Sequence, residues 1–139
     1  LDFRYAPDFS VILDSVSGVT VVTQKPPVVT LRKGETATMD CNLGTVTDYQ
    51  AVWYKQTPGG VPQFVLYFYH TNSAPTYGSG FSSPKFTSNH QSTSDYRLII
   101  NNVEEGDSVV YYCSRTHTQL QQPPCMLYLI FCPCFCVSG

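Results

Sequence analysis

Three stretches of the chain show apolar residues at every second position. The stretches are residues 37–43, 96–100 and 109–113, and in the first the apolar positions run from Ala37 to Leu43. This period of two is typical of a β-strand that buries one face and exposes the other. The pattern therefore predicts three strands, each with one face in a core.

Shorter apolar runs bounded by turn residues predict further strands. They lie at residues 19–24, 28–31, 51–56, 64–69 and 84–88. Between residues 70 and 80 the chain is rich in Asn, Ser, Pro and Gly, which predicts a loop. Many short strands with regular turns and no helical period predict an all-β fold, an antiparallel β-sandwich.

Composition narrows the functional class. Of the 139 residues only 13% are charged and the net charge is −2, so neither nucleic acid nor an anionic membrane is an expected partner. Six cysteines indicate an oxidising compartment, reached through the secretory pathway. The ten tyrosines exceed what a core needs, and tyrosine is favoured at antibody-type binding surfaces.

Two cysteines carry the strongest motif. Cys41 is followed twelve residues later by Trp53, and Tyr111 stands two residues before Cys113. A pair of cysteines with a Trp between them and a Tyr before the second is a mark of an immunoglobulin sandwich. The chain thus resembles an immunoglobulin domain, with a Greek-key connection of its strands.

Several segments in order resemble a light-chain variable domain more closely. They are residues 22–27 (VTQKPP), 53–62 (WYKQTPGGVP), 77–88 and 95–107. The last two are similar to lambda or sigma light chains of non-mammalian vertebrates. The resemblance covers about residues 19–114 and implies a V-type sandwich that binds antigen and pairs with a heavy-chain variable domain, or with a second copy of itself.

The resemblance also implies a scaffold. Cys41 and Cys113 are expected to form a disulfide with Trp53 packed on it, and Leu98 to lie in the same core. Tyr111 is expected to donate a hydrogen bond to the backbone near Asp107. The family usually pairs this Asp with an Arg; here the position is Lys85, which lacks the bidentate fork, so a weaker ion pair is expected.

Two functional surfaces follow from the resemblance. Antigen is expected to contact three loops at one end of the sandwich, at residues 44–50, 69–76 and from Ser114 onwards. The candidate contact residues are Thr45, Thr47, Asp48, Tyr49, Tyr69, His70, Asn72, Arg115 and His117. The candidate pairing residues are Tyr54, Gln56, Pro62, Phe64 and Tyr112.

The two ends of the chain depart from the family pattern. Residues 1–18 are poorly patterned and are expected to be a non-domain segment, a leader remnant or non-coding-derived, in a fragment or processed product. Residues 115–139 form a Cys-rich apolar tail without the Phe-Gly-x-Gly motif of a J-derived last strand. Within this tail, residues 127–131 have strong β character and are a candidate replacement strand.

Three origins of the tail stay open. It is an unrearranged germline segment translated past its recombination point, the tail of a surrogate-type light chain that pairs with a nascent heavy chain, or part of an invariant cell-surface V-type receptor or a sequence error. The tail cysteines are Cys125, Cys132, Cys134 and Cys136. The last three are separated by single residues, which does not fit a structural zinc site.

No catalytic pattern accompanies these features. His70, His90 and His117 lie in predicted loops or turns without a nucleophile motif, a Gly-rich phosphate loop or a metal-ligand pair. The sequence therefore predicts a binding protein with no enzyme activity, no cofactor and no metal, secreted or on the extracellular side of the plasma membrane.

Overall fold

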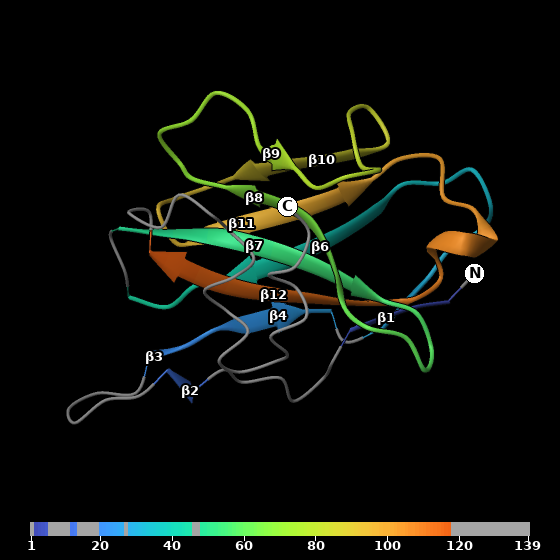
Figure 1. Ribbon diagram of the computed structural model, residues 1–139, viewed down its shortest axis with the longest axis horizontal. Helices are drawn as coiled ribbons and strands as arrows, with labels where there is room; N and C mark the ends of the chain where they lie inside the picture. The colour runs from blue at the N-terminus through green and yellow to red at the C-terminus, as the bar shows by residue number, and fades with distance from the viewer. Residues whose placement is uncertain (1, 6–11, 14–19, 27, 46–47, 118–139) are drawn as a thin grey trace.

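The computed structural model describes residues 2–5, 12–13, 20–26, 28–45 and 48–117 (Figure 1). Two sheets face each other across one core. The larger sheet has six strands in the order β5-β1-β12-β7-β8-β9, and the smaller has four in the order β10-β11-β6-β4. A short pair, β2-β3, stands apart. The predicted all-β sandwich is confirmed.

Most strands coincide with the predicted runs, but two lie within residues 1–18 and one lies in the predicted loop between residues 70 and 80. The larger sheet contains β5 (Val28–Thr30), β1 (Asp2–Tyr5), β12 (Val110–His117), β7 (Tyr49–Gln56), β8 (Gln63–Phe68) and β9 (Thr76–Tyr77). The smaller contains β10 (Phe86–His90), β11 (Asp95–Ile100), β6 (Ala37–Asn42) and β4 (Thr23–Lys25), and the separate pair is β2 (Ile12–Leu13) and β3 (Thr20–Val21). A 3-10 turn, η1 (Glu105–Asp107), precedes β12.

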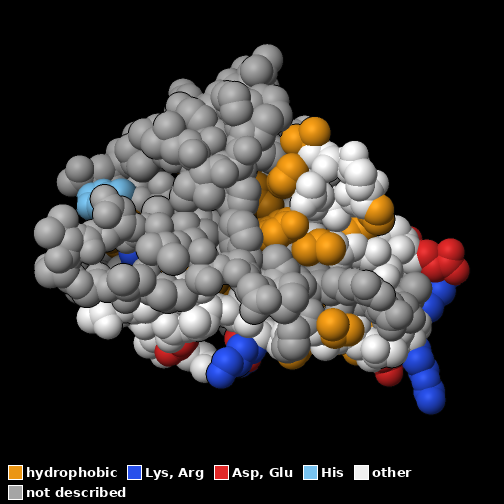
Figure 2. Space-filling model, turned by 90° about the horizontal axis from the view of Figure 1, so that it is seen from below, with side chains coloured by type: hydrophobic (Ala, Val, Ile, Leu, Met, Phe, Trp, Pro, Cys, Tyr) orange, Lys and Arg blue, Asp and Glu red, His pale blue; other side chains and the backbone are white. Residues whose placement is uncertain are grey.

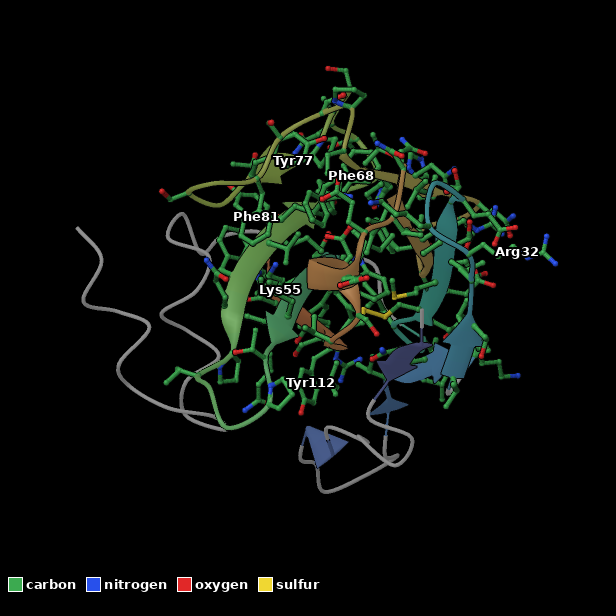
Figure 3. The ribbon with its side chains drawn as sticks, turned by 90° about the vertical axis from the view of Figure 1, so that its right-hand side faces the viewer. Arg32, Lys55, Phe68, Tyr77, Phe81 and Tyr112 are labelled. Atoms are coloured by element: carbon green, nitrogen blue, oxygen red, sulfur yellow. A yellow bond between two sulfur atoms is a disulfide. The ribbon has the colours of Figure 1, made fainter. Side chains whose placement is uncertain are left out.

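The core lies between the two sheets, around the predicted disulfide. Cys41 on β6 and Cys113 on β12 are bonded, with their Cα atoms 6.2 Å apart, and the bridge lies between the sheets in Figure 3. Trp53 and Leu98 are fully buried beside it. In β6 the burial alternates residue by residue, as the sequence period predicts.

The corner before β12 is closed by polar bonds, as predicted. The Tyr111 hydroxyl donates to the Asp107 carbonyl oxygen at 3.0 Å, and burial raises the pKa of Tyr111. Lys85 Nζ donates to Asp107 Oδ2 and, at 2.9 Å, to the Asn102 carbonyl oxygen. The same Oδ2 accepts the Glu104 N–H at 2.8 Å. The ion pair uses one carboxylate oxygen, so it lacks the two parallel bonds that an Arg would give.

The N-terminal segment differs from the prediction. Residues 1–18 were expected to lie outside the domain, yet β1 is an interior strand of the larger sheet. It runs antiparallel to β5, with Asp2 opposite Thr30, and parallel to β12, with Tyr5 opposite Tyr111. The expectation was wrong for Asp2–Tyr5 because pairing with two distant strands leaves no local alternation in the sequence.

Candidate functional site: the loop end and the outer sheet face

The connections expected to bind antigen lie together at one end of the sandwich, the left end in Figure 1. There β6 leads into β7, β8 into β9, and β12 ends. The third connection starts later than predicted, because β12 continues to His117 and pairs with β7 over its whole length, with His117 opposite Tyr49. Residues 114–117 are therefore strand and not loop.

The candidate contact residues differ in their exposure. Thr45, Asp48 and Asn72 are exposed, whereas Tyr49, Tyr69, His70 and His117 are half-buried. Thr47 lies outside the described residues. Arg115 is only 5% exposed and lies in β12, not in a loop. Its place inside β12 turns the side chain toward Leu43 and Tyr49.

Arg115 is the centre of a small polar and aromatic cluster. Its Nη1 donates to the Leu43 carbonyl oxygen at 3.0 Å, and its Cζ lies 4.9 Å from the centroid of the Tyr49 ring. The ring of His117 meets Tyr49 edge-on at 5.3 Å. Burial lowers the pKa of the Arg115 guanidinium, an effect that Tyr49 partly opposes.

A second cluster forms at the end of β8. The ring of His70 lies 4.3 Å from that of Tyr69, and its backbone N–H donates to the Tyr96 hydroxyl oxygen at 3.0 Å. The ring centroid of His90 lies 6.4 Å from that of His70, although His90 is not among the candidate contact residues and was expected in a loop or turn. It is brought there by β10, in register with Tyr96 on β11, a pairing that only the sheet reveals.

The predicted pairing residues do gather on the outer face of the larger sheet, opposite the disulfide. The Tyr112 hydroxyl donates to Gln56 Oε1 at 2.7 Å, and Gln56 Nε2 donates to the Gly60 carbonyl oxygen at 2.8 Å. Tyr54 and Phe64 meet edge-on at 6.2 Å. Figure 3 shows Tyr112 pointing away from the disulfide.

This face is more apolar than the sequence indicated. Val52 and Tyr54 form a cluster separate from the main core, with exposures of 0% and 2%, and Phe64, Tyr67 and Tyr112 pack against it. Val52 and Tyr67 were missed because an apolar residue in a strand gives no sign of which face it occupies until the register is known. Pro62 is half-buried, and Val61 beside it is 60% exposed.

Hydrophobic side chains also gather at the surface of the described part. Figure 2 shows them in a band on one side of the molecule, with Lys, Arg, Asp and Glu side chains toward its margins. A contiguous apolar patch of this kind usually marks an interface with another protein. In the described part of the chain, the connections thus gather at one end of the sandwich and apolar side chains lie on the outer face of the larger sheet.

Within the described ranges, no group of three or more His, Cys, Asp or Glu side chains is placed to hold a metal ion. In the same ranges no helix has the length and apolar character needed to cross a membrane. The tail cysteines and residues 127–131 lie outside the described residues.

Comparisons with known proteins agree with the fold. The model of the family described as "Immunoglobulin V-set domain" matches residues 24–124. The chain is 32% identical over 98 residues to Ig kappa chain V region 120 of Oryctolagus cuniculus, a match covering 70% of this chain and 84% of that protein. It is 33% identical over 78 residues to human T cell receptor gamma variable 5, covering 56% of this chain and 66% of the relative.

A solved structure gives a similar picture. The fold matches that of a marsupial T cell receptor with a TM-score of 0.59 and 27% identity. The match covers 66% of this chain and 42% of the chain of that receptor. The present chain thus spans less than half of that larger protein.

Proposed function

Because this chain belongs to the immunoglobulin V-set family, we propose that it is the light-chain variable domain of an antigen receptor. It pairs with a heavy-chain variable domain through the outer face of the larger sheet, and it binds antigen through the loops at one end. The observation that carries the proposal is a group of half-buried aromatic side chains on that outer face, Phe64, Tyr67 and Tyr112, which pack against the buried Val52 and Tyr54.

The details of the pairing face support this function. The hydrogen bond from Tyr112 on β12 to Gln56 on β7 fixes the positions of both side chains in the unbound chain. Phe64 and Tyr67 stack with their centroids 6.0 Å apart beside them. Preorganised aromatic groups bind with a smaller loss of side-chain entropy. The disulfide between Cys41 and Cys113 supports a secreted or cell-surface location.

The type of light chain and the origin of the tail belong to the same proposal. The motifs of residues 77–88 and 95–107 favour a lambda- or sigma-like type. The replacement strand at residues 127–131 and the germline origin of the tail stay predictions, since neither falls within the described residues.

Pairing is tested by mixing the purified chain with isolated heavy-chain variable domains and measuring association by sedimentation. We expect a micromolar or tighter complex that Phe64→Asp weakens at least about tenfold, because it buries a charge in the interface. Thr38→Asp, at an exposed position on β6 in the other sheet, is the matched control and keeps the affinity. A chain that stays monomeric with every heavy-chain domain contradicts the proposal, and a homodimer weakened by Phe64→Asp supports the second copy as partner.

A T-cell receptor chain is a second candidate. The similarity to T cell receptor gamma variable 5 and to the marsupial receptor favours it. A light chain and a T-cell receptor chain would both pair through the outer face of the larger sheet, so the identity of the partner domain distinguishes the two proposals. Selective association with a T-cell receptor variable domain, in competition with heavy-chain domains, would support this candidate over the light chain.

A further inference from the structure

Arg115 is a buried cation without a counter-ion among the described residues. Its Nη1 is bonded to the Leu43 carbonyl oxygen, but its Nε is buried and has no hydrogen-bond partner. Nε and the neighbouring Nη2 form the side of the guanidinium that can hold both oxygens of a carboxylate. That side of Arg115 is left without an acceptor in the described part of the chain.

The ion pairs of the described residues do not involve Arg115. They join Lys85 to Asp107 and Arg97 to Asp40. The described start of the first connection offers no acid either, because Leu43, Gly44 and Thr45 include neither Asp nor Glu. Asp48, next along the first connection, is exposed and takes part in neither ion pair.

A buried charge in this condition is costly. A polar group taken out of water loses free energy unless it regains its hydrogen bonds, and a charge loses more. The guanidinium stays protonated at neutral pH even though burial lowers its pKa. The Arg115 cation lies over the Tyr49 ring, with its Cζ 4.9 Å from the ring centroid, and this contact compensates only part of the lost solvation. An added anion would compensate the rest.

The place of this cation connects it with the proposed binding function. Arg115 lies near the end of β12, opposite Ala51 near the start of β7, where the sheet gives way to the binding loops. Its neighbours among the described side chains and backbone groups are the Tyr49 ring and the Leu43 carbonyl oxygen, both from the first connection or the strand that follows it. Loop ends of this kind rearrange on binding more readily than the sheet does, which gives a ligand access to a buried group.

We propose that the Nε side of Arg115 recognises a carboxylate, and that this carboxylate is an Asp or Glu side chain of the bound antigen. The antigen as its source rests on the proposed receptor function. The oxyanion site itself depends only on the geometry around Arg115. The planar guanidinium selects a planar carboxylate through two parallel bonds, which a lysine in the same place would not form.

The site is tested directly on the full chain by following the Nε–H resonances of its arginines by NMR. We expect sodium acetate to shift the Arg115 resonance in a saturable way, at an ionic strength held constant with NaCl. The Arg97 resonance should not follow, because Arg97 already binds Asp40 at 2.8 Å. An Arg115 resonance that is unchanged overturns the proposal, and so does one that responds to inorganic phosphate at lower concentration than to acetate.

The source of the carboxylate is tested with peptides selected at random for binding to the chain. We expect an acidic residue to be enriched at one position, and the enrichment to disappear with Arg115→Gln. Arg115→Lys should bind the selected peptides at least about tenfold more weakly, since it keeps the charge but not the fork. Arg97→Gln, the matched control, should bind them as the unmodified chain does.

The outcomes separate this inference from the proposed function. Selected peptides without acidic enrichment overturn the assignment to antigen. Acidic enrichment in a chain that ignores every heavy-chain domain supports the site while contradicting the light-chain proposal. If Arg115→Gln does not fold, the peptide affinity of Arg115→Lys and the resonance shift in the unmodified chain still test whether Arg115 binds a carboxylate.

Discussion

Two buried tyrosines show how single residues set the response of this sandwich to pH. The Tyr96 hydroxyl oxygen accepts the His70 N–H, and the Tyr111 hydroxyl donates to the Asp107 carbonyl oxygen, each at 3.0 Å. Burial raises the pKa of Tyr96 to about 12 and raises that of Tyr111 as well. Both phenols are therefore held neutral in the fold at a pH where free tyrosine ionises.

The sign of the pH effect follows from that difference. In the unfolded chain tyrosine ionises near pH 10, so the folded state binds more protons above that pH. The contribution of the neutral phenols to the free energy of unfolding is fully present below about pH 10. It decreases as the pH rises toward 12, by up to about 1.4 kcal/mol per pH unit for each tyrosine. We expect Tyr96→Phe to reduce the slope of the free energy of unfolding against pH in this interval, measured by urea denaturation. Tyr67→Phe is the control, and an unchanged slope in Tyr96→Phe would contradict the assignment.

Residue positions were predicted well where a motif fixes them. Cys41, Trp53 and Tyr111 have the roles that the resemblance to an immunoglobulin domain implies, since the packing around a disulfide constrains them together. Arg115 was misplaced because the sequence does not say how far β12 extends. Its burial depends on the register of eight residues of β12 with eight of β7, and that register is a non-local property.

At the scale of elements, β1 is the strand that joins β5 to β12. β7 pairs with all eight residues of β12, whereas β1 pairs only with Val110 and Tyr111. Just beyond this pairing, the backbone of β12 bonds to a side chain from the smaller sheet. The Gln24 side chain continues the bonding there, donating to the Tyr111 carbonyl oxygen at 2.7 Å and accepting the Cys113 N–H at 2.9 Å.

The contribution of β1 is tested with Arg4→Pro. Arg4 is opposite Val28 on one side and Val110 on the other, so a proline removes a backbone donor from an interior strand. We expect a loss of about 1–3 kcal/mol in the free energy of unfolding, together with faster amide exchange in β5. Ser10→Pro, outside the described strand, is the control. Equal stability of the two variants would show that β1 does not hold the sheet together.

The other elements were predicted because each carries its own signal. The alternation of apolar and polar residues in β6 and β11 indicates which face of each strand is buried. The end of β7 is marked by the turn residues Thr57–Gly60. The strand expected at residues 84–88 begins at Phe86, after a proline that cannot donate to a ladder. β1 has only four residues, and the residues it pairs with lie more than twenty positions away, so no local sequence pattern predicts this strand.

At the scale of the whole molecule, the disulfide joins the two sheets into one cooperative unit. It links strands of opposite sheets across 72 positions of sequence. In the chain-entropy account, closing a loop of that length stabilises the fold by roughly 4 kcal/mol. Small domains are stable by about 5–15 kcal/mol in total, so the bridge supplies a large share.

Replacing both bridge cysteines with alanine should therefore lower the free energy of unfolding by roughly 4 kcal/mol, measured by urea denaturation. The tail cysteines complicate a simple reduction experiment, and the double variant resolves this. If the bridge alone stabilises the domain, a reducing agent lowers the stability of the unmodified chain but not that of Cys41→Ala/Cys113→Ala. A reducing agent that destabilises the double variant by a similar amount would show that the tail forms a structural bridge of its own. Because Trp53 is fully buried in the same core as the bridge, its fluorescence should report the same transition as the denaturation curve.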